Sequence, residues 1–321
     1  METMMHDFRE LERMVHSADH LLLLTDQRPD GDTFGSSLAF GEYLRGRGKR
    51  VTHFVMTPPL SALAFLHGIQ ECTGDHSVLK DMSIDVAIAF DSSREDVIRP
   101  LVPSGVPLVV VDHHASNTRF GELNVVDVTA TSTCEVVYAF LRHVGCAVTS
   151  SMAKCLVTGI VTDTGAFVHL GSGSVREQTR AFEAAERLLL KGGSVRRVVQ
   201  EVLRATSVPR LQLWGRIFSR LRYIPHLRMA VTVVLLADFE ALDVSSGDIS
   251  EISDYLGATL DVDIVLFLKE QADGIKVSAR SHETDMLPLM QAFGGGGHAH
   301  ACGFFLPGAR LAQRGGQLVV E

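Results

Sequence analysis

The sequence predicts an α/β protein in which a mostly parallel sheet flanked by helices is followed by a second, smaller α/β domain. Apolar runs alternate with helix-periodic segments through the first part of the chain, a rhythm typical of right-handed βαβ units. That rhythm changes after Pro225, where strands and helices follow in a different order. With 321 residues and 46% hydrophobic content, the chain can bury the cores of two domains.

The elements of the first domain follow from its periodicity. Phe8, Leu11, Met14 and Val15 recur at helical spacing and predict an opening helix. Apolar runs predict strands at 21–25, 51–55, 86–90, 108–111 and 125–126. Helices are expected at 35–47, 62–66, 133–143, 151–161 and 181–190.

The second domain is expected to contain strands at 229–236, 264–269 and 275–280, with helices at 249–255 and 285–293. We place the first domain at residues 1–192, a helical connector at 193–225 and the second domain at 226–321.

Composition excludes several classes of function. A net charge of -8 argues against a protein that coats long duplex nucleic acid, although a short anionic substrate remains compatible with it. No run reaches 18 apolar residues, so no membrane span is expected, and residues 1–20 lack a signal-peptide core. The five cysteines form no CxxC pair, which favours free thiols in a reducing cytoplasm.

Acidic and imidazole side chains follow the ends of several predicted elements. Open α/β folds hold their sites where parallel strands end, so we expect these side chains to converge. They are Asp26, Asp30, Asp32, Asp91, Asp112, His113, His114 and Asp163.

Such a group of carboxylates predicts a metal centre. Crowded without a cation, the carboxylates would raise one another's pKa values, and divalent ions remove that penalty. Oxygen-rich ligand sets without thiolates favour Mn²⁺ or Mg²⁺. Two such ions form the arrangement that serves phosphoester displacement, in which a hydroxide attacks phosphorus in line.

The second domain carries groups suited to phosphate. Arg280 and Ser281 end a predicted strand, and Arg280 can contact a phosphate in a bidentate manner. The run Gly294–Gly297, followed by His298, is expected to form a loop that exposes backbone N–H groups. A flexible linker for the glycines and a surface ion pair for Arg280 are the structural alternatives.

These residues resemble the motifs of a known family. Pro29-Asp30-Gly31-Asp32, Asp91, Asp112-His113-His114 and the segment 159–165 resemble the metal motifs of the DHH phosphoesterase superfamily. Segment 274–281 and the glycine run with His298 resemble the companion DHHA1 domain. The size is similar to that of the nanoRNase branch, oligoribonucleases that also dephosphorylate 3′-phosphoadenosine 5′-phosphate.

The resemblance implies a role for each matching position. One metal ion is expected on Asp26, Asp30 and Asp91, and the other on Asp32, Asp91, His113 and Asp163, so that Asp91 bridges the two. His114 is expected to contact the scissile phosphate or the leaving oxygen, which makes Asp91, His113 and His114 the expected catalytic residues. Asp112 is expected to orient a neighbouring histidine. The expected substrate contacts are Arg280, Ser281, Gly295, Gly296, Gly297, His298 and Asn117.

Asp26 departs from the family pattern, which usually has histidine at this position. Two interpretations stay open. Asp26 either binds through oxygen and favours Mg²⁺ over Mn²⁺, or its shorter reach leaves the first metal weakly held.

Three functional hypotheses follow. The first is a metal-dependent phosphoesterase that degrades very short single-stranded RNA and dephosphorylates 3′-phosphoadenosine 5′-phosphate. The second is a phosphodiesterase of cyclic or linear dinucleotides, and the third is a catalytically weak nucleotide-binding protein, suggested by Asp26 alone. The sequence is compatible with a homodimer as well as with a monomer.

Overall fold

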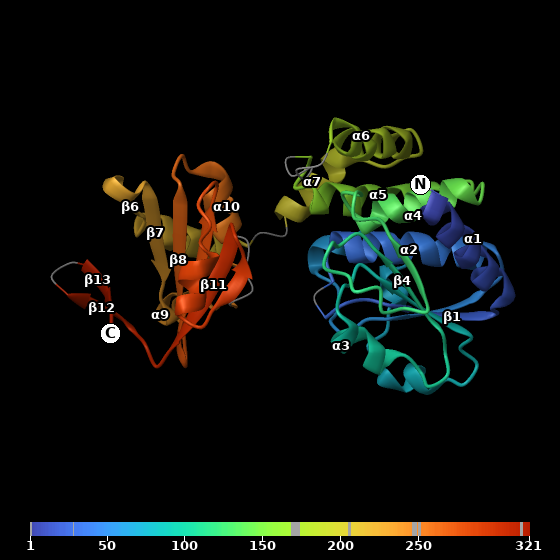
Figure 1. The fold of residues 1–321 in the computed structure, drawn as a ribbon, viewed down its shortest axis with the longest axis horizontal. Helices are drawn as coiled ribbons and strands as arrows, with labels where there is room; N and C mark the ends of the chain where they lie inside the picture. The colour runs from blue at the N-terminus through green and yellow to red at the C-terminus, as the bar shows by residue number, and fades with distance from the viewer. Residues whose placement is uncertain are drawn as a thin grey trace. The chain divides into compact units, whose positions relative to one another are not determined.

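The chain forms two compact units, Met1–Ala205 and Thr206–Glu321, each with its own hydrophobic core (Figure 1). The computed structural model describes residues 2–27, 29–167, 174–204, 207–245, 249, 252–314 and 317–321. Within these residues no helix is long and apolar enough to cross a membrane.

The first unit is built on a five-stranded parallel sheet with the strand order β2-β1-β3-β4-β5. This confirms the predicted α/β class and the mostly parallel sheet. The strands are β1 (His20–Leu24), β2 (Arg50–Phe54), β3 (Val86–Phe90), β4 (Leu108–Asp112) and β5 (Leu123–Val126).

Both faces of this sheet are covered, which explains why its strands are continuous apolar runs. Leu21 and Leu23 belong to one core cluster, while Leu22 and Leu24 belong to another on the opposite face. The first face carries a thick helical layer, to whose core Leu63 and Ile69 also belong. The second face carries α3 (Glu95–Ile98) with the 3₁₀ turns at His76–Lys80 and Arg99–Leu101 (Figure 1). The helices are α1 (Glu2–Ser17), α2 (Gly31–Gly46), α3 (Glu95–Ile98), α4 (Thr133–His143), α5 (Ser150–Asp163), α6 (Val175–Leu189) and α7 (Val195–Arg204), and the turns are η1 (Ser61–Leu63), η2 (Ile69–Glu71), η3 (His76–Lys80) and η4 (Arg99–Leu101).

Helix α2 begins at Gly31, earlier than the expected residue 35. The carboxylate of Asp30 caps the helix by accepting hydrogen bonds from the backbone N–H groups of Asp32 and Thr33. Because of this cap, Asp32 lies in the first helical turn rather than in a loop.

The second unit contains a six-stranded mixed sheet with the order β10-β11-β9-β8-β7-β6, which confirms the expected smaller α/β domain. Its strands are β6 (Arg222–Ile224), β7 (Met229–Val234), β8 (Ile264–Gln271), β9 (Gly274–Ser281), β10 (Gly296–His298) and β11 (Ala301–Pro307). A separate hairpin follows, formed by β12 (Leu311–Arg314) and β13 (Gln317–Val320). The helical segments are α8 (Val208–Ser219), η5 (Pro225–Leu227), α9 (Leu236–Leu242), α10 (Ile252–Thr259) and α11 (Leu287–Ala292).

Several expected boundaries in the second half are corrected by the structure. The strand expected to reach residue 236 ends at Val234, because the Asp238 carboxylate accepts a hydrogen bond from the Leu235 N–H and starts α9. The helix expected at 249–255 is described as Ile252–Thr259, and residues 250 and 251 lie outside the described part of the chain. The helix expected at 285–293 is the shorter α11.

The segment expected as a connector is divided between the two units. Helix α7 contributes Val198 to the core of the first unit. Helix α8 contributes Leu213 and Ile217 to the core of the second unit.

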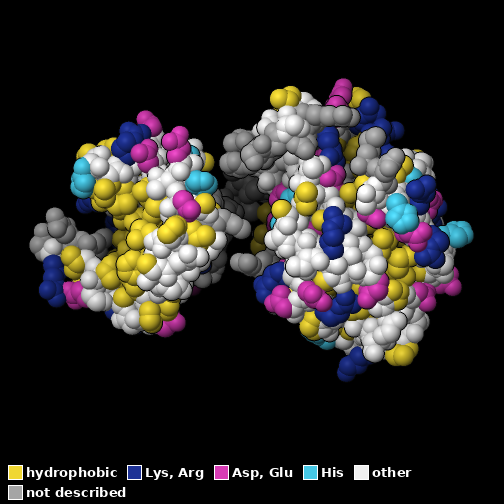
Figure 2. All heavy atoms as spheres, viewed as in Figure 1, with side chains coloured by type: hydrophobic (Ala, Val, Ile, Leu, Met, Phe, Trp, Pro, Cys, Tyr) yellow, Lys and Arg dark blue, Asp and Glu magenta, His cyan; other side chains and the backbone are white. Residues whose placement is uncertain are grey.

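On the face shown in Figure 2, basic and acidic side chains of the first unit are interspersed, with no stripe of a single sign.

Candidate metal centre

Three neighbouring strands end at one edge of the parallel sheet and carry the acidic and imidazole groups there. Strand β3 lies between β1 and β4. Asp26 follows β1, Asp91 follows β3, and His113 and His114 follow β4. The N-terminus of α2 and the C-terminus of α5 add Asp32 and Asp163 to this edge.

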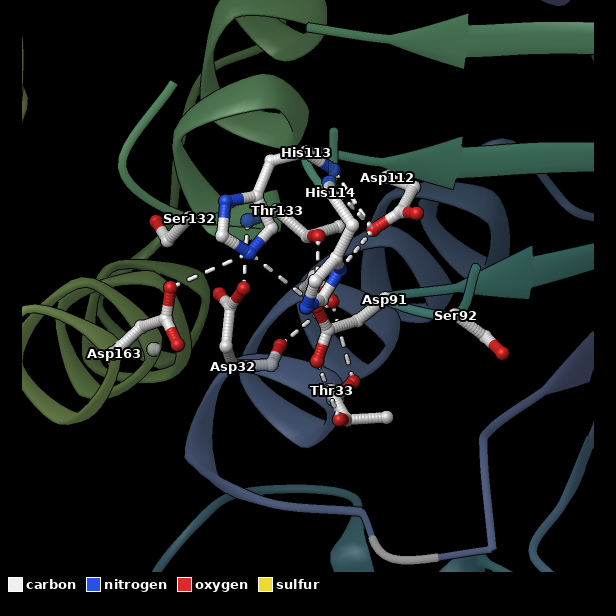
Figure 3. Close-up of polar contacts among 12 residues, drawn as sticks. Asp32, Thr33, Asp91, Ser92, Asp112, His113, His114, Ser132, Thr133 and Asp163 are labelled. Carbon is white, nitrogen blue, oxygen red and sulfur yellow. Dashed lines mark hydrogen bonds and ion pairs between the residues drawn. The ribbon is translucent and has the colours of Figure 1, made fainter. Parts of the chain in front are cut away.

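His113 presents one ring nitrogen to two carboxylates (Figure 3). Its Nδ1 lies 3.3 Å from the carbonyl oxygen of Ala130, which is the geometry of a donated hydrogen bond. Its Nε2 is buried and has no hydrogen-bond partner among the described residues. It lies 3.4 Å from Asp163 Oδ2 and 3.8 Å from Asp91 Oδ1. A proton on Nδ1 leaves a lone pair on Nε2, the form in which imidazole binds a metal.

Asp32 is fully buried and is held by the N-terminus of α4. Its Oδ2 accepts a hydrogen bond from the Thr133 N–H at 2.6 Å, and its Oδ1 accepts one from the Cys134 N–H at 2.9 Å. Burial raises the pKa of Asp32, and the negative charges of Asp91, Asp163 and Asp30 raise it further.

Asp91 is fixed by two hydroxyl groups from different helices. The hydroxyl of Thr33 donates to its Oδ2 at 2.7 Å and that of Thr133 to its Oδ1 at 3.1 Å. The backbone of Asp91 is left-handed, with a φ of 56°, a conformation that aspartate tolerates better than most residues. Burial, followed by the charge of Asp30, raises the pKa of Asp91 to about 7.

This arrangement fits a divalent cation. Two groups of three side chains each bring one ligand atom within 4.8 Å of the others, namely Asp91 with His113 and His114, and Asp32 with His113 and Asp163. The pKa of Asp163 is also raised, mainly by burial. Carboxylates that raise one another's pKa values around a buried, unpartnered imidazole nitrogen need positive charge between them, and a cation supplies it.

Asp112 serves His114 rather than the cation position. Its Oδ1 lies 2.7 Å from His114 Nδ1, and its Oδ2 accepts a hydrogen bond from Asn117 Nδ2 at 2.7 Å. Burial by itself would raise the pKa of Asp112, but these hydrogen bonds bring it below the usual value. The hydrogen bond to Asp112 raises the pKa of His114 to about 9 against the opposing effect of burial. The amide of Asn117 also donates to the Ser92 carbonyl oxygen at 3.2 Å.

Asp26 and Asp30 lie beside this centre with other hydrogen bonds. Ser92 Oγ donates to Asp26 Oδ2 at 2.8 Å, and the Gln27 N–H donates to Asp26 Oδ1. Asp30 Oδ1 is the cap of α2 described above. Neither residue belongs to the two three-residue groups, so the ligand roles expected for both stay predictions.

Apart from Asn117, which lies in the first unit, the expected substrate residues lie in the second unit. Arg280 of β9 lines a cavity of about 440 Å³ with Lys276, Ser278, Gly303 and Phe305. The structure corrects the expectation of a glycine loop, because Gly296 and Gly297 lie in β10 and pair with Gly303 and Cys302 of β11. Gly295 packs against the carbonyl oxygen of Gly303, too closely for a Cβ.

Ser281 Oγ donates to the carbonyl oxygen of Thr284 at 2.5 Å. The backbone of His298 is in β10, and its side chain lies outside the described part of the chain. The substrate contacts expected of these residues and of Asn117 stay predictions.

Several residues that orient the centre were not identified from the sequence. Thr33, Ser92 and Thr133 donate hydroxyl hydrogen bonds to the expected ligands Asp91 and Asp26. The Ser132-x-x-Glu135 pattern at the start of α4 is a capping signature, and Ser132 Oγ accepts from the Glu135 N–H at 3.2 Å. That signature could have placed a helix N-terminus, with its free N–H groups, near the acidic cluster.

Comparison with known proteins agrees with this geometry. A model described as the N-terminal domain of the DHH family matches residues 20–160, and the DHHA1 domain model matches residues 228–315. The chain belongs to the DHH/DHHA1 family. It is a phosphoesterase, a hydrolase that acts on phosphoester bonds.

Similar proteins span nearly the whole chain. The bifunctional oligoribonuclease and PAP phosphatase NrnA of Thermus thermophilus is 29% identical over 91% of this chain and 86% of its own length. The protein of the same name from Bacillus subtilis is 28% identical over 92% and 91%. The fold is similar to that of an exopolyphosphatase-related protein from Bacteroides fragilis, with a TM-score of 0.83, 24% identity and coverage of 93% and 90%.

Proposed function

We propose that this DHH-family phosphoesterase uses two divalent cations, Mn²⁺ or Mg²⁺, to degrade very short single-stranded RNA and to dephosphorylate 3′-phosphoadenosine 5′-phosphate. The observation that carries the proposal is that Asp32, Asp91 and Asp163 converge on Nε2 of His113. This nitrogen has no hydrogen-bond partner among the described residues. The substrate class is supported by the names of the relatives that match nearly the whole chain.

Each ligand has a defined place in the proposed centre. Asp32, Asp91, His113 and Asp163 would hold one cation, and Asp26, Asp30 and Asp91 would hold the other. When bound, the cations would activate the attacking water and neutralise the charge that develops on the phosphoryl oxygens. The backbone N–H groups of Thr133 and Cys134 hold Asp32 in place, and the hydroxyls of Thr33 and Thr133 do the same for Asp91.

In the proposed reaction, His114 is the residue that donates a proton or a hydrogen bond. Asp112 holds Nδ1, which leaves Nε2 to donate a hydrogen bond to a phosphate or to the leaving oxygen. The side chain of His114 is 45% exposed, whereas that of His113 is 15% exposed. Of the two histidines, His114 is therefore the one that a substrate can reach.

The cavity beside Arg280 suits a nucleotide end. Arg280 and Lys276 provide positive charge for a phosphate, and Phe305, 37% exposed, provides an aromatic surface for a base. We expect Arg280→Ala to raise the KM for a dinucleotide at least tenfold and to leave the metal titration of the protein unchanged. Steady-state kinetics and a Mn²⁺ titration of the same preparation test this prediction, and an unchanged KM would place Arg280 outside the substrate site.

The function itself is tested by hydrolysis assays. Substrates are a labelled RNA dinucleotide, a longer RNA, 3′-phosphoadenosine 5′-phosphate and cyclic di-AMP, each with Mn²⁺ and with Mg²⁺. We expect fast turnover of the dinucleotide and of 3′-phosphoadenosine 5′-phosphate, and slow turnover of the longer RNA. Selective loss of cyclic di-AMP would replace the proposal with a cyclic-dinucleotide phosphodiesterase. Binding without turnover in either metal would favour a nucleotide-binding protein.

Two variants control the assay. Asp91→Ala should abolish turnover. Asp91→Asn keeps the side-chain shape and tolerates the left-handed backbone, so it separates loss of the charge from loss of the local structure. Activity in both variants would show that the observed hydrolysis comes from a contaminating nuclease.

A further inference from the structure

A short segment between β5 and α4, residues 127–135, touches three of the proposed metal ligands. The carbonyl oxygen of its Ala130 accepts the hydrogen bond that fixes the ring of His113. Thr133 contributes its N–H to Asp32 and its hydroxyl to Asp91 (Figure 3). The position of this segment therefore sets the direction of the lone pairs that would meet the cations.

Both ends of the segment are bound to one side chain of α6, that of Arg180. At the first end, Arg180 Nη2 lies 2.9 Å from Asp127 Oδ2, and Nη1 donates to Thr129 Oγ1 at 2.8 Å. At the other end, Arg180 Nε forms an ion pair with Glu135 Oε1 at 2.7 Å, without the alignment of a hydrogen bond. Three nitrogen atoms of one rigid guanidinium thus contact three residues of the segment, a geometry that lysine cannot reproduce.

The carboxylates that Arg180 contacts organise the backbone of the segment. Glu135 Oε2 accepts hydrogen bonds from the N–H and the hydroxyl of Thr131, at 3.0 and 3.1 Å. Asp127 Oδ1 accepts from the N–H and the hydroxyl of Thr129, at 3.0 and 2.6 Å. The side chain of Glu135 is only 4% exposed, so its charge depends on a nearby cation.

We propose that Arg180 is a positioning residue of the metal centre, which holds segment 127–135 in the one arrangement that aims His113, Asp32 and Asp91 at the cations. The described contacts of Arg180 are with Asp127, Thr129 and Glu135, and it acts on the ligands through these residues. The inference rests on the proposed function. It adds a residue of α6, the helix that follows α5 in the chain, that determines how the metal ligands are oriented. Groups that hydrogen-bond directly to metal ligands typically contribute 10- to 100-fold to metal affinity, and Arg180 holds the segment that supplies such groups.

The test is a Mn²⁺ titration of metal-free protein, with free Mn²⁺ followed by electron paramagnetic resonance. Three variants are compared with the parent protein: Arg180→Ala, Arg180→Lys and Arg187→Ala. Arg187 lies on the same helix and is exposed, and among the described contacts it has no hydrogen bond or ion pair, so it is the matched control. We expect 10- to 100-fold weaker binding in Arg180→Ala, a smaller loss in Arg180→Lys and no change in Arg187→Ala.

Two further readouts distinguish positioning from a general loss of stability. Ethylguanidinium added to Arg180→Ala should restore much of the Mn²⁺ affinity, because it can place a guanidinium group in the space that the arginine side chain occupied. The visible spectrum of bound Co²⁺, which depends on nitrogen ligation by His113, should shift in Arg180→Ala and return with ethylguanidinium. If Arg180→Ala does not fold, the same comparison is made with Arg180→Lys.

The outcomes separate this inference from the proposed function. Equal Mn²⁺ affinity and an unchanged Co²⁺ spectrum in folded Arg180 variants would overturn the role of Arg180 and leave the metal centre intact. A parent protein that binds no Mn²⁺ would overturn the proposed function itself.

Discussion

At the scale of single residues, each carboxylate of the centre is held by hydrogen bonds from a different part of the chain. Asp32 depends on backbone N–H groups of α4, and Asp91 depends on hydroxyls of α2 and α4. These bonds stabilise the charged forms that a cation needs, while burial and mutual repulsion act against them. In the metal-free protein these carboxylates therefore repel one another, and cation binding removes that repulsion.

Asp26 is the residue at which the chain departs from its family, and its contacts suggest a direct test. Ser92 Oγ donates to its Oδ2, so a water or cation would have to share that oxygen. We expect Asp26→His to raise the affinity for Mn²⁺ relative to Mg²⁺, because imidazole is a better ligand for the softer ion. Parallel titrations of the two metals measure the effect, with Ser92→Ala as the control for the lost hydrogen bond. Unchanged curves in Asp26→His would remove Asp26 from the set of ligands.

His53 lies in β2 and is not one of the proposed metal ligands. It predicts how the free energy of unfolding depends on pH. Its side chain is buried, and its Nε2 has no hydrogen-bond partner among the described residues. Burial, followed by the charge of Arg45, lowers the pKa of His53 to about 3. In the unfolded chain the pKa of histidine is about 6.5. Between these values the unfolded state binds one more proton, so the free energy of unfolding falls as the pH falls below about 6.5.

The size of this effect follows from the two pKa values. Between pH 7 and pH 5 the parent protein should lose about 2 kcal/mol more of its free energy of unfolding than the variant His53→Leu. Urea unfolding of both proteins at the two pH values, in chelator, measures the difference. The carboxylates of the metal centre affect both proteins equally and cancel. An identical pH dependence in the two proteins would mean that the pKa of His53 is the same in the folded and unfolded states.

At the scale of elements, the close packing of α2 on α5 brings Asp32 to the end of the sheet. Gly159 of α5 faces Asp32, and a Cβ at this position would lie 2.5 Å from Asp32 Oδ1 and against Cys134 Sγ. We expect Gly159→Ala to lower the free energy of unfolding by about 1–3 kcal/mol and to weaken metal binding as Asp32 is displaced.

Gly46, at the end of α2, is the matched control for that substitution. A Cβ at Gly46 meets no atom within 4 Å, so Gly46→Ala should stabilise the protein by up to about 1 kcal/mol. Urea unfolding and a Mn²⁺ titration of both variants measure the two effects. Normal metal affinity in Gly159→Ala would show that α2 and α5 can separate without moving Asp32.

The elements also show what the sequence could predict. The strands of the first sheet were predictable because both faces are buried and the apolar runs are continuous. Asp91 and His113 could be placed together because the carboxyl ends of neighbouring parallel strands meet at one edge. Short-range patterns were sufficient for both predictions.

Other features depend on contacts between distant segments, and the sequence did not reveal them. The start of α2 depends on the Asp30 cap, and the role of Thr133 depends on residues about one hundred positions away in the chain. Strand β10 contains glycines that suggested a loop, but pairing with β11 overrides their low strand propensity.

At the scale of the whole molecule, the two units divide the proposed work between them. The first unit carries the candidate cation ligands, and the second carries the cavity with Arg280. Only the first unit should therefore gain stability when a metal is added. Trp214, the single tryptophan of the chain, lies in α8 of the second unit, so its fluorescence reports on the unfolding of that unit.

Thermal unfolding with and without Mg²⁺ tests this division. At a Mg²⁺ concentration of about 100 times Kd the first unit should gain about 2.7 kcal/mol, or roughly 5–10 °C in Tm. Calorimetry should show this shift, while the midpoint of the Trp214 fluorescence transition should stay within about 1 °C of its value in chelator. Asp163→Asn should abolish the calorimetric shift because it removes a ligand of the buried group. If the Trp214 transition moves as far as the calorimetric one, the two units unfold together, and binding in one is coupled energetically to the other.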